Sequence, residues 1–138
     1  LDNQDFDDDG IESLNFMGKI AYQFSDQFTI DAMAAYDDIQ SDFDGGAFVD
    51  FDSDFDQNQL RLAISPTYRL SGGKIRGNIS YHSNNRIFDS PARTSGARII
   101  SEFTGNTLQA DLIFDQYLTD DLKILGGVNY QKPKSDFE

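Results

Sequence analysis

Hydrophobic and polar residues alternate with a period of two along most of the chain. From residue 13 to residue 25, for example, Leu14, Phe16 and Ile20 share one parity, while Ser13 and Lys19 share the other. Successive side chains of a strand point to opposite faces, so this pattern predicts a strand and does not fit a helix. It recurs five more times. We predict six strands, at residues 13–25, 28–37, 58–70, 74–83, 103–117 and 122–132.

The predicted connections alternate between short and long. Tight turns are expected near Asp26, Gly72 and Asp120, whereas residues 38–57 and 84–102 form long polar stretches that we expect to be loops. Strands joined in this way predict an all-β, antiparallel, up-and-down meander. Pro66 falls within a predicted strand and has no N–H for the ladder, so a β-bulge is expected there.

Aromatic residues gather at both ends of the predicted strands, on the same face as the aliphatic residues. Those near the tight turns are Tyr22, Phe24, Phe28, Tyr68 and Phe114; those near the long connections are Phe16, Tyr36, Tyr81 and Tyr130. Two aromatic bands, with short turns on one side and long loops on the other, are typical of an outer-membrane β-barrel. A soluble antiparallel sheet with one buried face shares the alternation and remains the alternative.

Composition narrows the class of protein further. The 138 residues contain no cysteine and carry a net charge of −13, which argues against nucleic acid as a partner and leaves no disulfide or thiolate site. Mean hydropathy is −0.51, and no apolar run is long enough for a transmembrane helix. A barrel wall can still be this polar, because only alternate residues face lipid. The polar start lacks a signal peptide, so we expect a mature or internal segment.

Six strands are fewer than the roughly eight of the smallest bacterial barrels. An open sheet would also leave two unpaired edges in lipid, which the bilayer does not tolerate. We therefore expect the chain to be a fragment of a larger barrel, or one chain of an assembly that closes the barrel.

Aspartates are dense on the side of the long connections. One cluster follows Gln4, and a second lies in the first long connection; together they comprise Asp5, Asp7, Asp8, Asp9, Asp42, Asp44, Asp50, Asp52, Asp54 and Asp56. Calcium prefers such oxygen ligands. The first cluster opens like an EF-hand loop but has Phe16 where that loop needs glutamate. Either a calcium site assembled from two loops or a solvated acidic surface fits these residues.

No catalytic constellation is visible in the sequence. His82 is the single histidine and lies on the polar face of a predicted strand. Ser65 and Ser80 have no base partner at a meaningful spacing. We predict that the chain is not an enzyme.

Several short motifs resemble the TonB-dependent outer-membrane cobalamin (vitamin B12) receptors. They are Asp-Asp-Asp-Gly at residues 7–10, Phe-Ser-Asp at 24–26, Ser-Asp-Phe-Asp at 41–44, Ile-Ser-Tyr-His-Ser at 79–83 and Gly-Gly-Val-Asn-Tyr-Gln-Lys at 126–132. Their order and spacing carry the resemblance, which covers essentially the whole chain. Phe43 stands where the family often has tyrosine.

The resemblance implies a 22-stranded barrel with a plug domain, which imports cobalamin across the bacterial outer membrane with energy delivered by TonB. It implies calcium as the cofactor and a lipid bilayer as the surroundings. The implied metal ligands are Asp7, Asp9, Asp44 and Asp52, with Asp50 and Asp54 as further candidates. The implied substrate contacts are Phe43 and the stretch from Asn85 to Arg98. The alternatives are a receptor for a siderophore or glycan, and a soluble calcium-binding or adhesive β-domain.

Overall fold

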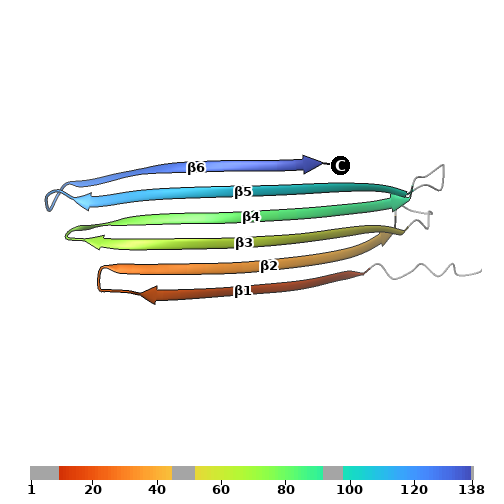
Figure 1. Ribbon diagram of the computed structural model, residues 1–138, viewed down its shortest axis with the longest axis horizontal. Coiled ribbons are helices and arrows are strands. Elements are labelled where there is room, and N and C mark those ends of the chain that lie inside the picture. The colour runs from red at the N-terminus through yellow and green to blue at the C-terminus, as the bar shows by residue number, and fades with distance from the viewer. Residues whose placement is uncertain (1–9, 45–51, 92–97, 138) are drawn as a thin grey trace, which may run out of the picture.

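The computed structural model describes residues 10–44, 52–91 and 98–137, which form one antiparallel sheet. Its strands are β1 (Ile11–Gln23), β2 (Phe28–Asp44), β3 (Asp52–Leu70), β4 (Gly73–Pro91), β5 (Arg98–Tyr117) and β6 (Lys123–Phe137). Each strand pairs with the next along the chain, in the order β1-β2-β3-β4-β5-β6. Figure 1 shows a single layer of strands lying side by side. The predicted all-β, antiparallel, up-and-down meander of six strands is confirmed.

Three short turns lie together at one end of the sheet, on the left in Figure 1. In the first, the Ser25 hydroxyl accepts hydrogen bonds from the backbone N–H groups of Gln27 (3.3 Å) and Phe28 (3.1 Å). In the second, Gly72 has φ of +80°, a conformation that a Cβ atom disfavours. In the third, Thr119 Oγ1 accepts from the N–H of Leu122 at 3.1 Å. Local hydroxyls and one glycine therefore set the hairpins.

The strands extend further toward the other end of the sheet than the sequence predicts. Residues 38–44, 52–57, 84–91 and 98–102, which we expected to belong to long loops, continue β2, β3, β4 and β5. The reason is that the alternation of residue types continues in β3, but the hydrophobic residue now lies on the other face of the strand. Aspartates occupy alternate positions in β3 from Asp52 to Asp56, and Phe55 lies between two of them. When a strand's hydrophobic residues move to the opposite face, the positions that were hydrophobic become polar. A prediction that considers those positions alone then takes the segment for a loop.

The expectation of a β-bulge at Pro66 is wrong. Pro66 pairs with Ile30 of β2, and the register between β3 and β4 is the same on both sides of Pro66, so no residue is inserted. Between Asp54 and Leu70, the pairing with β4 is interrupted at residues 65 and 66 and nowhere else. Gly77 lies beside the proline ring: a Cβ atom built there would be 3.1 Å from Pro66 Cγ. A glycine next to the proline thus accommodates the ring without a bulge.

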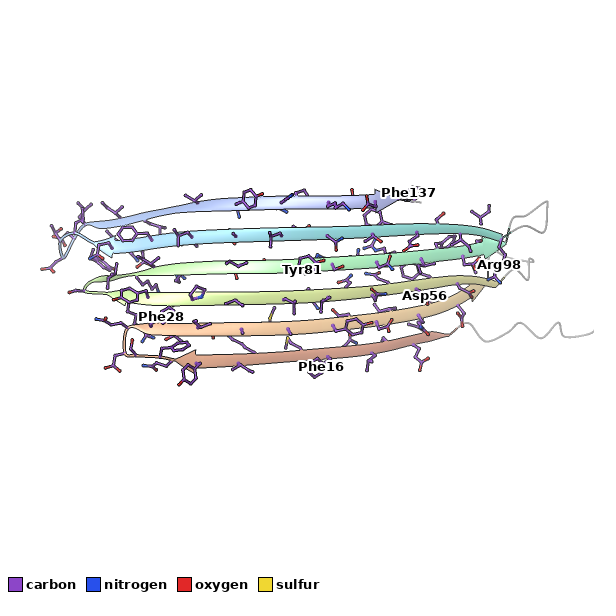
Figure 2. The ribbon with its side chains drawn as sticks, in the orientation of Figure 1. Phe16, Phe28, Asp56, Tyr81, Arg98 and Phe137 are labelled. Atoms are coloured by element: carbon purple, nitrogen blue, oxygen red, sulfur yellow. The ribbon has the colours of Figure 1, made fainter. Side chains whose placement is uncertain are left out.

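The sheet has two faces and no second layer among the described residues. We call face A the one that carries Ile64 and Ile79, and face B the one that carries Ser65 and Asn78. Because every register is continuous, a side chain's face follows from its position along the strand. In Figure 2 the side chains project from a single sheet. Among the described hydrophobic residues only Ala35 is buried, with 4% of its surface exposed.

Candidate functional site

Face A carries a broad band of exposed hydrophobic side chains. Its central rows run across all six strands and contain Ile20, Ala32, Ile64, Ile79, Ala110, Leu62, Leu108, Leu112 and Val128. The exposed fractions of Ile64 and Ile79 are 53% and 57%. Exposed apolar surface on this scale marks a site that contacts another molecule or a membrane.

The length of this apolar band can be compared with the thickness of a bilayer. On β3 the band runs from Leu60 to Leu70. At about 3.3 Å per residue this is about 33 Å along the strand, and a tilt of about 40° would reduce it to about 25 Å, the height of the apolar belt of an outer-membrane barrel. We use the term apolar band for face A between the rows of Leu60 and Leu70. The outer section is the part of the sheet beyond the Leu60 row: residues 10–15, 37–44, 52–59, 84–91, 98–105 and 135–137.

Tyrosine hydroxyls at the borders of the band point away from its centre. On the outer side, Tyr36 donates to Asp38 Oδ2 (3.4 Å), one row further out. Tyr81 donates to Asn106 Oδ1 (2.9 Å) in the same direction. Tyrosines at a membrane interface have this arrangement, with the ring in the apolar layer and the hydroxyl in the polar one.

The opposite border of the band repeats the arrangement near the short turns. There Tyr68 donates to Gln27 Oε1 at 3.2 Å. The rings of Tyr22 and Phe24 pack edge to face with their centroids 4.6 Å apart. Tyr130 does not follow the sequence prediction, since it lies opposite Ala110 in the row of Ile79, within the band.

Face B behind the band is polar and its groups pair with one another. Asp111 accepts hydrogen bonds from Asn78 (3.3 Å), Gln109 (2.9 Å) and Asn129, which connects three strands. Ser65 extends this chain of bonds by donating to Asn78 at 3.0 Å. Within the part of the chain that the structure describes, no buried side-chain nitrogen or oxygen lacks a partner.

Charged residues on face B are largely matched by opposite charges. Lys19 lies 3.3 Å from Asp31, and Arg61 pairs with Asp37. Asp115, only 5% exposed, lies between Arg76 (3.7 Å) and Lys123 (4.0 Å). These side chains lie on the face opposite the apolar band, so the sheet has one surface suited to lipid and one suited to water.

The acidic residues of the outer section lie mainly on face A. An open polar groove there is lined by Gly10, Ile11, Glu12, Gln40, Asp42, Asp54 and Asp56. Asp42 and Asp54 lie directly opposite each other on β2 and β3. The sequence analysis gave Asp54 as a metal candidate but did not select Asp42, Asp56 or Glu12. Their even spacing with Asp54 along extended strands is the signal that could have identified them.

An arginine already occupies part of this acidic surface. Arg98, at the start of β5, donates to Asp89 Oδ1 (2.9 Å) and to Asp54 Oδ2 (3.1 Å). The hydrogen bond to Asp89 raises the pKa of Arg98 above its ordinary value, and the charges of both carboxylates act in the same direction. Within residues 10–44, 52–91 and 98–137, no three His, Cys, Asp or Glu residues are grouped closely enough to hold a metal ion.

The remaining predicted site residues are placed as follows. Asp7, Asp9 and Asp50 lie outside the described residues. The backbones of Asp44 and Asp52 pair with each other, and that of Phe43 pairs with Ser53.

The predicted substrate contact Asn85 lies on face A, where it accepts a hydrogen bond from Thr104 Oγ1 at 3.2 Å. Its neighbour Arg86 is exposed on face B. His82 is also exposed on face B, opposite Arg61.

Comparison with known proteins adds little to this description. No family model matches the chain, and no curated protein matches it. Among solved structures, a cryo-EM structure of the gasdermin A3 membrane pore is similar at a TM-score of 0.15 and 12% identity, over 96% of this chain. The chain spans 55% of the length of that structure. A likeness this weak carries no argument. The described residues contain no helix that is long and apolar enough to cross a membrane.

Proposed function

We propose that this chain forms part of the wall of a bacterial outer-membrane β-barrel. The observation that carries the proposal is the two-faced sheet: an exposed apolar band on face A that runs from Leu60 to Leu70 on β3 and is bordered by tyrosines, and a hydrogen-bonded, largely polar surface on face B. Face A then meets lipid and face B meets the lumen. The short turns lie on the periplasmic side and the outer section extends beyond the membrane.

This proposal includes further strands. In the described sheet, β1 and β6 each have one unpaired edge. Within lipid such edges must be hydrogen-bonded, so additional strands, from the same protein or from other chains, close the barrel. A 22-stranded barrel of the TonB-dependent type, with a plug domain in its lumen, satisfies this requirement.

The proposed activity is TonB-dependent import of cobalamin, with calcium ordering the outer ends of the strands. The motifs at residues 7–10, 24–26 and 126–132 support the family. The acidic groove that contains Asp42, Asp54 and Asp56 supports a role for cations, because its negative charge attracts them. Since no three carboxylates of the described residues are close enough to hold an ion by themselves, the proposed site takes further ligands from the aspartates of residues 5–9 or from Asp50. No catalytic role is proposed for any residue.

The soluble alternative makes a different use of face A. A soluble β-domain would need a second layer over Ile64, Ile79 and their neighbours, and the described residues supply none. The tyrosines at both borders of the band favour the membrane over a soluble calcium-binding or adhesive domain.

Spin labels on single cysteines test the membrane proposal directly, because the chain has no cysteine of its own. The protein that contains this chain is reconstituted in lipid vesicles, with labels at Leu62 or Ile79 on face A and at Ala63 or Ser80 on face B. Labels on face A should be relaxed by oxygen, which dissolves in lipid, and labels on face B by a water-soluble nickel chelate. Equal responses from Leu62 and Ala63 would contradict a membrane wall.

The substrate and the ion need a separate experiment. Cobalamin binding is measured with and without calcium for the wild type and for a double variant, Asp44→Ala with Asp52→Ala. We expect the double variant to lose most of the calcium-dependent affinity, whereas Asp136→Ala, which removes an exposed carboxylate paired with Lys134, should not. Binding of a siderophore or glycan in place of cobalamin would support the alternative receptor, and unchanged affinity in the double variant would remove the calcium role.

A further inference from the structure

The outer section of face B carries an arc of hydrophobic rings, although face B is polar behind the apolar band. Phe55 of β3 lies directly opposite Phe88 of β4, and Phe103 of β5 lies directly opposite Phe137 of β6. Phe88 and Phe103 are diagonal neighbours, because Phe88 pairs with Ser101. The register therefore places one phenylalanine on each of four adjacent strands, at the same end of face B.

Arg86 lies within this arc. It is opposite Gln57 on one side and Phe103 on the other, and it is exposed. Arg61, Arg76 and Arg98 each have a carboxylate within ion-pair distance. Among the described residues, no carboxylate lies within ion-pair distance of Arg86. The aspartates of the outer section are mostly on face A, and the sheet separates them from this guanidinium.

The position of the arc restricts what can cover it. If face B lines a lumen, as we propose above, lipid cannot reach these rings, and a partner must come from water. An added strand from another protein is also disfavoured, because β4 and β5 are hydrogen-bonded on both sides and offer no free edge. We commit to a small solute, whose chemistry must match both the rings and the cation. The proposed plug domain is the other possible cover, and the titrations below distinguish it, because an arc covered by protein would bind neither probe.

We propose that this arc, formed by Phe55, Phe88, Phe103, Phe137 and Arg86, binds a water-soluble ligand that has a flat ring system and an anionic group. The rings stack on the apolar surface of the ligand, and the guanidinium donates charge-assisted hydrogen bonds to the anion. The inference rests on the proposed function only in that face B is taken to be the lumen. The proposal adds the chemical class of the ligand that the outer section of face B binds.

Two probes that differ only in charge test the site: 2-naphthalenesulfonate and the uncharged 2-naphthalenesulfonamide. Their binding is measured by calorimetry on the vesicle-reconstituted protein, with protein-free vesicles as the blank. We expect the sulfonate to bind about tenfold more tightly, as a charge-assisted hydrogen bond predicts. A preference for an anion would be diagnostic, since the chain carries a net charge of −13 and repels anions in general.

The variants separate the two parts of the site. Arg86→Gln should abolish the preference for the sulfonate and leave sulfonamide binding unchanged, and Phe103→Ser should weaken the binding of both probes. Lys132→Gln is the matched control, because it removes one positive charge from face A and should leave the preference intact.

Either of two results would overturn the site: no sulfonate preference in the wild type, or full preference in Arg86→Gln. Arg86→Lys keeps the positive charge and should retain the sulfonate binding that Arg86→Gln loses. It thereby controls for the possibility that a substitution at position 86 abolishes binding by misfolding the protein. A failure of the membrane proposal can be told apart from a failure of this site. The first would appear in the spin labels at Leu62 and Ala63, and the second in these titrations.

Discussion

Between Leu60 and Leu70, β3 presents hydrophobic side chains on face A and mostly polar ones on face B, whereas between Ser53 and Gln59 face A is polar and the single hydrophobic residue lies on face B. There, face A carries aspartates and face B carries Phe55. The strand is continuous through both regions and keeps its pairing with β2 throughout. The environment of each face therefore changes along the strand, while the backbone structure stays the same. A soluble sheet with one buried face gives no reason for such a change, but a wall that leaves a bilayer does.

The largest expected effect comes from a charge placed at different depths on face A. Ile64→Arg puts a guanidinium near the middle of the apolar band, and Asn58→Arg puts one on the same face in the outer section. We expect Ile64→Arg to lower the free energy of unfolding in vesicles by about 2–4 kcal/mol and Asn58→Arg by about 0–1 kcal/mol. Equilibrium unfolding in guanidinium chloride measures both. Equal costs would mean that face A meets one uniform environment.

Calcium removal should affect only one of the two regions. If the ion binds the acidic groove at a concentration about a hundred times its dissociation constant, its removal costs about 2.7 kcal/mol of stability in the region that it orders. Hydrogen exchange should then accelerate in the outer ends of β2 and β3, near Asp42 and Asp54, and stay constant around Ile64. Uniform acceleration along both strands would argue against a site in the outer section.

A smaller effect is expected where Gly77 adjoins Pro66 within the band. A Cβ atom at Gly77 would be 3.1 Å from Pro66 Cγ, so Gly77→Ala should cost about 1–2 kcal/mol of stability. Gly126→Ala is the control on the same face, because nothing lies within 4 Å of its Cβ position. Adding Pro66→Ala should relieve most of the cost of Gly77→Ala, which a double-mutant cycle measures. An equal cost with alanine at position 66 would show that the proline ring is not responsible.

The sequence predicts the band better than the outer section, for a physical reason. In the band, the strands that carry Ile20, Ile64 and Ile79 keep their hydrophobic residues on one face, so a period of two is enough to find each strand. In the outer section most hydrophobic residues lie on the other face, although Leu14, Ile87 and Ile100 do not, and they are sparse. Asp38, Asp42 and Asp54 are then taken for loop residues, although each belongs to a strand.

Cross-strand neighbours are the other feature that a single sequence conceals. Pro66 indicates a bulge when it is considered alone, and only the register places Gly77 beside it. Arg98 lies far from Asp54 along the chain, and only pairing through β4 brings the two together. The sequence predicted an acidic site formed by aspartates. Which residues line the groove depends on which strands are neighbours and on the face on which each residue lies.

The smallest expected effect concerns Arg98, which connects the ends of three strands in the outer section. Its side chain lies 2.9 Å from Asp89 on β4 and 3.1 Å from Asp54 on β3. The hydrogen bond to Asp89 raises the pKa of Arg98 above its ordinary value, so the guanidinium is charged at neutral pH. Because all three side chains are partly exposed, the pairs are screened by water and salt and contribute little to global stability.

Arg98→Gln should therefore leave the unfolding transition unchanged and act locally. Hydrogen exchange at the outer ends of β4 and β5 should rise by less than about tenfold at low salt, and the difference from the wild type should vanish in about 1 M salt, where the Debye length is about 3 Å. Lys134→Gln is the matched control. It removes an ion pair of 2.9 Å with Asp136 that lies within one strand, so it should alter no strand pairing. A rise for Arg98→Gln that persists in high salt would show that the side chain acts by packing and not by its charge.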